Sequence, residues 1–214
     1  MKLRILSGIV IGLLFVTSII WVKQLFYPVI LLVAILMLLE WYMMTKSSSL
    51  FLLAGLPIIS IPIISLLLVG FIDQNRFILL TYFIIIWSVD TFAMLGGKTI
   101  RGPKLAPYIS PNKTWSGLLT GIISASLISL LFCISLNFSI YNYYFSNKIH
   151  IILTSMLIAL ISQLSDLFVS CFKRKFKVKD TGHIIPGHGG ILDRFDSIIL
   201  TAPLLLIIVY IGGI

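Results

Sequence analysis

Long apolar stretches separated by short polar segments dominate the sequence. An apolar helix needs about 20 residues to cross the hydrocarbon core of a bilayer. Seven stretches approach that length, at roughly 3–22, 25–44, 50–71, 77–97, 115–136, 150–172 and 190–213. The pattern predicts an all-α, polytopic integral membrane protein with about seven transmembrane helices, within a range of six to eight. Pro57 and Pro62 predict a kink or break in the third helix, because proline removes a backbone donor.

The composition supports a membrane protein. Hydrophobic residues make up 59% of the 214 residues and charged residues 11%, and the mean hydropathy is +1.11. A soluble globular domain carries about twice that share of charge. We therefore expect N-terminal transmembrane helices in residues 1–76 and a second transmembrane region in residues 77–214.

The basic residues predict the orientation. Lys and Arg in short loops concentrate on the cytoplasmic side of a membrane. With a cytoplasmic N-terminus and seven crossings, all of the 16 Lys and Arg except Lys23, Arg76 and Lys148 lie on the inner side. This arrangement accounts for the net charge of +9 without a nucleic acid partner. Most of the charge falls in two predicted cytoplasmic loops, 98–114 and 173–189.

Among the seven acidic residues, Asp90, Asp166, Asp193 and Asp196 stand out, because they fall inside predicted crossings near their cytoplasmic ends. An ionised carboxylate in the bilayer costs about 2.5–3.5 kcal/mol on insertion scales, so such residues face a cavity, a partner or an ion. Asp193 and Asp196 are three residues apart and share one helix face. The alternative is a set of ion pairs that tie helices together, such as Asp166 with Lys173.

Carboxylates beside a cluster of cations favour a bound metal and a phosphorylated ligand. Mg²⁺ prefers oxygen ligands and typically binds through one or two carboxylates plus substrate phosphates. Lys and Arg neutralise the remaining phosphate charge. Gly189 and Gly190 allow close approach of the backbone, and the following helix directs its free amides to the same region. The residues predict a site for a metal-bound polyphosphate at the cytoplasmic face, with His188 near the phosphates.

Three blocks of sequence carry a family resemblance. Residues 170–196, "SCFKRKFKVKDTGHIIPGHGGILDRFD", resemble the signature of the CDP-diacylglycerol synthase (phosphatidate cytidylyltransferase) family. "WSVDTFAMLGG", residues 87–97, and "LAPYISPNKTWSG", residues 105–117, resemble two further blocks of that family. The chain departs from the family pattern at Met94, Ser116, Ser165 and Val169, where the pattern has Tyr, Glu, Gly and often an acidic residue.

The resemblance implies transfer of CMP from CTP to phosphatidic acid, which gives CDP-diacylglycerol and pyrophosphate. It implies Mg²⁺ as cofactor, with a monovalent cation such as K⁺ beside it. The partners are then CTP and a bilayer lipid, with no nucleic acid, and we include a homodimer among the expected assemblies. The expected location is the bacterial inner (plasma) membrane, with the active site on the cytoplasmic side.

The resemblance also implies that residues 77–214 are the catalytic transmembrane region, and it assigns roles to individual residues. It implies catalytic roles for Asp166, Asp193, Asp196, Lys173 and Arg174, and the three aspartates are the expected metal ligands. The expected substrate-binding residues are Lys179, His188, Gly189, Gly190, Arg194, Asp90, Ser110, Lys113, Thr114 and Ser170.

Two alternatives stay open from the sequence. One is a related CTP-dependent enzyme that acts on another lipid phosphate or on a polyprenol. The other is a membrane transporter whose buried aspartates relay ions. Transporter sites lie near the bilayer midplane, whereas these carboxylates lie at one membrane edge, and this favours an enzyme.

Overall fold

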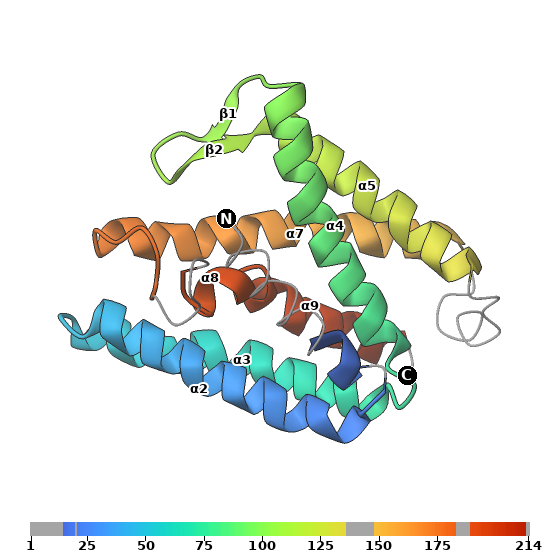
Figure 1. Ribbon diagram of the computed structural model, residues 1–214, viewed down its shortest axis with the longest axis horizontal. Coiled ribbons are helices and arrows are strands. Elements are labelled where there is room, and N and C mark those ends of the chain that lie inside the picture. The colour runs from blue at the N-terminus through green and yellow to red at the C-terminus, as the bar shows by residue number, and fades with distance from the viewer. Residues whose placement is uncertain (1–14, 20, 136–147, 183–188, 213–214) are drawn as a thin grey trace.

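The computed structural model describes residues 15–19, 21–135, 148–182 and 189–212, and these residues form a helical bundle with one small hairpin (Figure 1). The hairpin pairs β1 (Lys104–Ala106) with β2 (Ser110–Thr114) in antiparallel orientation. The labelled helices are α2 (Lys23–Thr45), α3 (Ser49–Ile72), α4 (Phe77–Thr99), α5 (Trp115–Ser135), α7 (Lys148–Lys175), α8 (Leu192–Phe195) and α9 (Ile198–Ile211).

Five of these helices are long and apolar enough to cross a membrane: α2, α3, α4, α5 and α7. They coincide with the second to sixth stretches expected from the sequence, and this confirms the all-α, polytopic membrane architecture. The first expected crossing, at 3–22, falls largely outside the described residues. The total number of crossings and the orientation of the N-terminus stay predictions.

The prolines of α3 do not break it. The helix is continuous from Ser49 to Ile72 with Pro57 and Pro62 inside it, so the expected break is wrong. Each proline removes one hydrogen bond from the backbone. Packing of α3 between α2 and α9 holds the helix despite these losses, as neighbouring helices commonly do in membranes.

The last expected crossing, 190–213, is not one helix. It is divided at Asp196 and Ser197 into α8 and the 14-residue α9. The hydroxyl of Ser165 on α7 donates to the carbonyl of Asp196 and accepts from the amide of Leu200, at 3.1 Å. In an uninterrupted helix that amide and that carbonyl would bond to each other. Insertion of a side chain into the hydrogen-bond ladder is a recognised cause of helix bending.

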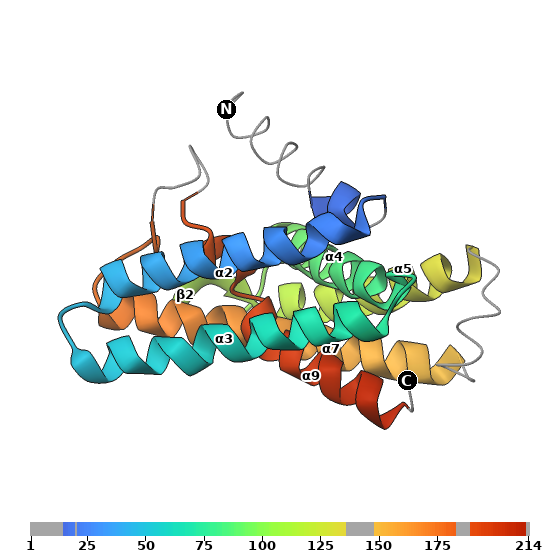
Figure 2. The same ribbon diagram turned by 90° about the horizontal axis from the view of Figure 1, so that it is seen from below.

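The helices pack into one core. In Figures 1 and 2, α2 and α3 run side by side. Figure 1 shows α4 crossing α7 at a steep angle, and α5 packs against α4. The shorter α9 lies against both α3 and α7. One cluster of buried apolar side chains includes residues from α2, α3, α4, α7 and α9. Residues from both parts expected from the sequence, 1–76 and 77–214, therefore pack together in this cluster.

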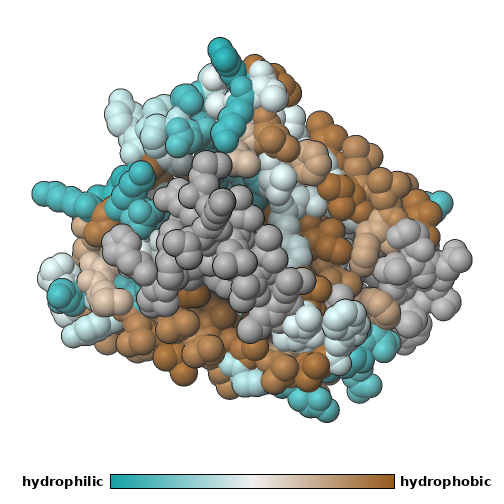
Figure 3. Space-filling model, viewed as in Figure 1, coloured by the Kyte–Doolittle hydropathy of each residue, from teal (hydrophilic) through white to brown (hydrophobic). Residues whose placement is uncertain are grey.

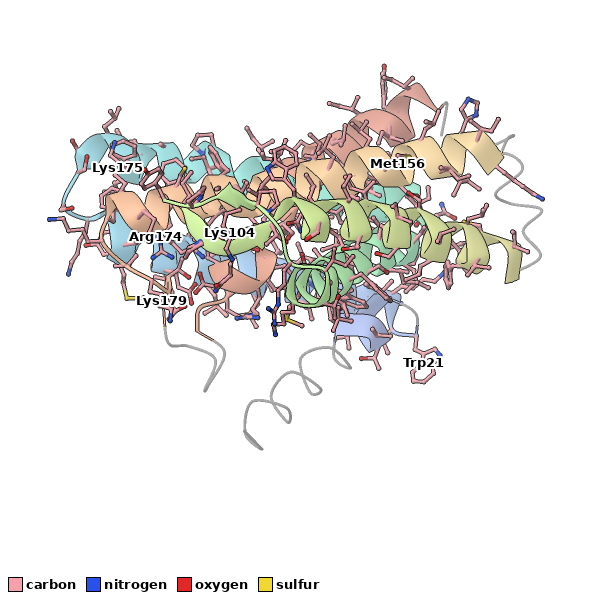
Figure 4. All side chains as sticks on the ribbon, turned by 90° about the horizontal axis from the view of Figure 1, so that it is seen from above. Trp21, Lys104, Met156, Arg174, Lys175 and Lys179 are labelled. Atoms are coloured by element: carbon pink, nitrogen blue, oxygen red, sulfur yellow. The ribbon has the colours of Figure 1, made fainter. Side chains whose placement is uncertain are left out.

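The surface separates into an apolar belt and a polar end. Large apolar side chains on several helices are exposed, including Leu53, Phe71 and Leu131, as expected for helices that face lipid. Hydrophilic residues gather over the hairpin and the adjoining helix end (Figure 3). Lys104, Arg174 and Lys179 lie at this end, far from Trp21 (Figure 4). The structure thus has one strongly basic end, and α7 continues into it as far as Lys175.

Candidate active site

Four carboxylates face one cavity near the basic end of the molecule. The cavity has a volume of about 310 Å³. Asp90 comes from α4, Asp166 from α7, Asp193 from α8, and Asp196 follows α8 directly. The remaining lining residues are Ala93, Met94, Asn112, Lys113, Thr114, Gly117, Leu118, Gln163 and Arg194. The structure therefore brings together seven of the residues singled out in the sequence, although they come from four separate segments.

Asp166 is paired with a lysine from the hairpin. Lys113 Nζ lies 2.6 Å from Asp166 Oδ2 and also donates to the carbonyl oxygen of Gln163 at 3.2 Å. The hydroxyl of Ser170, one turn further along α7, donates to Asp166 Oδ1 at 3.3 Å. The Asp166 side chain keeps 27% of its surface exposed. It is thus held in place but accessible from the cavity.

Asp193 is held more tightly. Lys173 Nζ lies 2.9 Å from Asp193 Oδ1, and the amides of Thr181 and Gly190 donate to Oδ2 at 2.9 and 3.0 Å. Only 6% of the Asp193 side chain is exposed. The pairing expected as an alternative, Asp166 with Lys173, is not the one observed, since Lys173 pairs with Asp193 and Asp166 with Lys113.

Asp90 and Asp196 add further negative charge. The carboxylate of Asp196 repels those of Asp166 and Asp90 and is attracted by Lys173 and Lys113. It also accepts a hydrogen bond from the amide of Ser197 at 2.8 Å. Asp90 interacts with the charges of Asp166, Lys113 and Arg194. These interactions connect three of the four carboxylates, Asp90, Asp166 and Asp196, and a cation between them would lower the repulsion.

The β1–β2 hairpin closes one side of the cavity. Arg174 Nε donates to the carbonyl oxygen of Ile109 at 3.1 Å and so joins α7 to the hairpin. At the start of α5 the hydroxyl of Thr114 accepts from the amide of Gly117 at 3.1 Å. Ser116, where the family pattern has Glu, donates through its hydroxyl to the carbonyl oxygen of Arg101. Short-range contacts therefore fix the lysine-bearing strand relative to α5 and α7.

Some expected substrate-binding residues lie outside the cavity lining. Lys179 is exposed in the segment after α7, and Ser110 begins β2. Gly189 adopts φ of +80°, a conformation that favours glycine, next to Asp193. His188 lies outside the described residues. Lys173 and Arg174, expected in a loop, belong instead to the last turn of α7.

Sequence reasoning missed Glu40. This carboxylate, fully buried near the end of α2, accepts hydrogen bonds from the amides of Ile191 and Leu192 and from the hydroxyl of Thr181. It thus contacts the signature segment from the opposite half of the chain. One signal was present, because Glu40 lies inside the expected crossing 25–44, near its end, just as the four aspartates lie near the ends of theirs.

The donor set fits Mg²⁺ in chemistry. Carboxylate oxygens are its preferred protein ligands, and one or two of them suffice when phosphates supply the rest. Asp166 and Asp193 border the cavity with lysines already beside them. Among the described residues, no three His, Cys, Asp or Glu side chains are gathered closely enough to bind a metal by themselves. The arrangement thus suits a metal that arrives with a phosphorylated ligand.

Comparison with known proteins places these residues in a family. The model of the Cytidylyltransferase family matches residues 46–211. The phosphatidate cytidylyltransferase of Rickettsia felis is 61% identical over 206 residues, which cover 96% of this chain and 91% of the relative. The enzyme of the same name from Rickettsia conorii is 60% identical over 205 residues, or 96% and 89% of the two chains.

A more distant relative matches a smaller part. The phosphatidate cytidylyltransferase of Staphylococcus saprophyticus is 41% identical over 126 residues, which cover 59% of this chain and 46% of the relative. The family match covers the site and most of the helices that build it. The chain belongs to the cytidylyltransferase family.

Proposed function

We propose that the protein is a phosphatidate cytidylyltransferase, which transfers CMP from CTP to phosphatidic acid and releases pyrophosphate. The observation that carries this proposal is the cavity in which four carboxylates from three separate segments meet Lys113 and Arg194. Its charge pattern suits a metal-bound triphosphate. Relatives about 60% identical over 96% of the chain bear the name of this activity.

The reaction requires charge neutralisation more than a strong base. The nucleophile is a phosphate oxygen of the lipid, which is already anionic at neutral pH. It attacks the α-phosphorus of CTP, the bond from that phosphorus to the bridging oxygen breaks, and pyrophosphate leaves with the bonding electrons. Catalysis of such a transfer rests on positioning and on electrostatic stabilisation of the transition state.

Three aspartates and two lysines of the site have defined roles in this scheme. Asp166 and Asp193 would hold Mg²⁺, with Asp196 as a further ligand, and a monovalent cation such as K⁺ would offset the remaining carboxylate charge. The metal, when bound, neutralises phosphate charge. Lys113 and Lys173 now neutralise Asp166 and Asp193 at 2.6 and 2.9 Å. Their ammonium groups are therefore in place to meet phosphate oxygens when the carboxylates bind metal.

The location of the site follows from the two substrates. CTP is a cytosolic nucleotide and phosphatidic acid is confined to the bilayer, so the reaction belongs at the inner headgroup plane of a bacterial plasma membrane. The gathering of Lys104, Arg174 and Lys179 at one end supports a cytoplasmic position for that end (Figure 4). A homodimer remains part of the proposal, and light scattering of the detergent-solubilised protein tests it.

A purified-component assay tests the activity. The protein in detergent, supplied with CTP, phosphatidic acid and Mg²⁺, is expected to form CDP-diacylglycerol and pyrophosphate in equal amounts. Omission of Mg²⁺, with EDTA present, is expected to abolish both products. A folded wild-type protein that makes neither product under these conditions contradicts the proposal.

The same assay separates the alternative substrates. A polyprenol kinase would convert CTP to CDP and would release no pyrophosphate. An enzyme for another lipid phosphate would release pyrophosphate with that lipid but not with phosphatidic acid. Parallel reactions with phosphatidic acid, a polyprenol and an ether-linked lipid phosphate therefore distinguish the three.

A further inference from the structure

Glu40 on α2 is a buried carboxylate without an ion-pair partner in the described part of the chain. Its side chain has no exposed surface. No Lys, Arg or His of residues 15–19, 21–135, 148–182 or 189–212 lies within 4.0 Å of its oxygens. A charge in such a place is costly unless hydrogen bonds satisfy it. Three donors do so: Ile191 and Leu192, which directly precede the cavity residue Asp193, and Thr181, whose amide donates to Asp193.

The donors occupy both carboxylate oxygens. Oε1 accepts from the amide of Ile191 at 2.8 Å. Oε2 accepts from the amide of Leu192 and from the hydroxyl of Thr181, each at 2.9 Å. If an NH₂ group replaced either oxygen, as in glutamine, its N–H would face the backbone N–H of Ile191 or Leu192, and two donors would oppose each other. The contact therefore requires a carboxylate.

The residues that Glu40 holds are adjacent to those that hold Asp193. Thr181 and Gly190 each donate a backbone amide to Asp193 Oδ2. Thr181 thus bonds to Glu40 with its hydroxyl and to Asp193 with its amide. A Cβ atom on Gly182 or Gly190 would overlap the Glu40 carboxylate, so the backbone passes directly against it. Glu40 therefore holds Thr181, one of the two amide donors to Asp193, and Ile191, which directly follows the other donor, Gly190.

We infer that Glu40 is a positioning residue, which orients Asp193 and the backbone of Gly189 and Gly190 for binding of the metal–nucleotide complex. This inference rests on the proposed function and extends it to a residue of the first half of the chain. Groups that orient metal ligands typically change metal affinity or activity by about 10- to 100-fold when they are mutated. We expect that range for loss of Glu40.

Glu40→Gln tests the inference, and Asp73→Asn is its matched control. Asp73 is also a buried carboxylate that accepts hydrogen bonds from helix-start amides, but it caps the end of α3 and its donors are at the start of α4. Glu40→Gln is expected to lower kcat about 10- to 100-fold and to change the KM for phosphatidic acid less than about twofold. Asp73→Asn is expected to change neither constant.

Two readouts do not depend on turnover. Hydrogen exchange is expected to accelerate at the amides of Ile191 and Leu192 in Glu40→Gln and to stay at the wild-type rate there in Asp73→Asn. The rise in Tm produced by Mg²⁺ and CTP is expected to need about tenfold more nucleotide in Glu40→Gln than in the wild type. Unchanged exchange at 191–192, or unchanged nucleotide binding and kcat, overturns the inference.

A pair of variants at Thr181 provides a milder test if Glu40→Gln fails to fold. Thr181→Val removes one of the three donors to Glu40, whereas Thr181→Ser retains the hydroxyl. Thr181→Val is expected to weaken nucleotide binding and to accelerate hydrogen exchange at residues 191–192, whereas Thr181→Ser is expected to keep both at wild-type values. Equal behaviour of the two variants overturns the inference. If the wild type makes no CDP-diacylglycerol but these differences appear, the proposed function fails and the positioning role stands.

Discussion

Two buried carboxylates at different ends of the molecule accept hydrogen bonds from the first amides of a helix. Asp73 Oδ2 accepts from the amides of Ile78 and Leu79 at 2.7 and 3.1 Å, and these donors are five and six residues away. Glu40 accepts from the amides of Ile191 and Leu192, which are 151 and 152 residues away. The same chemistry therefore starts a helix locally at one end and connects distant segments at the other.

The two carboxylates also differ in the groups that surround them. Asp73 lies near the charge of Arg76, whose guanidinium rests on the rings of Phe26 and Tyr27. Asp73 and Arg76 are both buried at that end. Glu40 lies behind a cavity lined by carboxylates and cations. We therefore expect substitutions near Asp73 to change stability alone and substitutions near the cavity to change turnover.

Asp193→Asn is the strongest test of this contrast. The variant keeps the size of the side chain but loses the charge that pairs with Lys173 and would bind metal. We expect kcat to fall about 100- to 1,000-fold, the loss typical of one electrostatic group in an active site. Membrane insertion should stay intact, whereas Tm should fall because the buried Lys173 loses its ion-pair partner. Near-normal turnover would show that Asp193 is not a metal ligand.

Lys113→Met should have the next largest effect. It removes the ammonium group beside Asp166 but retains a flexible apolar chain of similar length. We expect kcat/KM for CTP to fall about 10- to 100-fold, equivalent to about 1.4–2.7 kcal/mol. Lys104→Met on the neighbouring strand is the control, because Lys104 is exposed and does not line the cavity. Equal losses in both variants would point to general charge attraction instead of a local contact.

Ser165→Ala should act mainly on stability, although Ser165 lies near the site. It removes the hydroxyl that separates the Leu200 amide from the Asp196 carbonyl. Loss of a buried hydrogen-bonding group costs about 1–3 kcal/mol, or a fall in Tm of about 2–4 °C for each kcal/mol in a protein of this size. Ser165→Gly introduces the residue of the family pattern and should leave kcat within about threefold of Ser165→Ala. Thermal unfolding and steady-state kinetics measure both effects.

Asp73→Asn should have the smallest effect. Burial raises the pKa of the Asp73 carboxyl above its ordinary value, since it outweighs the neighbouring amides and Arg76. A neutral side chain is therefore tolerated, and the amide oxygen of Asn can still accept from Ile78 and Leu79. We expect a stability change within about 0.5 kcal/mol and unaltered kinetics. A large loss of turnover would remove the distinction between the two ends.

The lengths of the apolar stretches predicted the helices well, because each stretch is long enough to cross the bilayer by itself. Five expected stretches agree with α2, α3, α4, α5 and α7 to within a few residues at each end. The break between α8 and α9 could not be predicted in this way. It depends on Ser165, which lies 31 residues before Asp196 in the chain and meets it only after α7 has packed.

The site was predictable in part for the same reason. The four aspartates stood out because each is a carboxylate in an apolar stretch, and the structure gathers them around one cavity. Which lysine meets which aspartate was not encoded in spacing, since Lys113 and Asp166 come from different elements. Glu40 carried the same local signal as the aspartates, but its partners lie at the other end of the sequence.

The hydrogen bonds from Ile191 and Leu192 to Glu40 also set an order for biosynthesis. Residue 40 leaves the ribosome long before residues 191 and 192, so the Glu40 carboxylate enters the membrane before its two amide donors have been synthesised. It acquires its donors only when the last segment of the chain has been synthesised and docks against α2. A chain truncated before α8 therefore contains the basic end and most of the helices, but its cavity lacks a wall and Glu40 lacks its two amide donors.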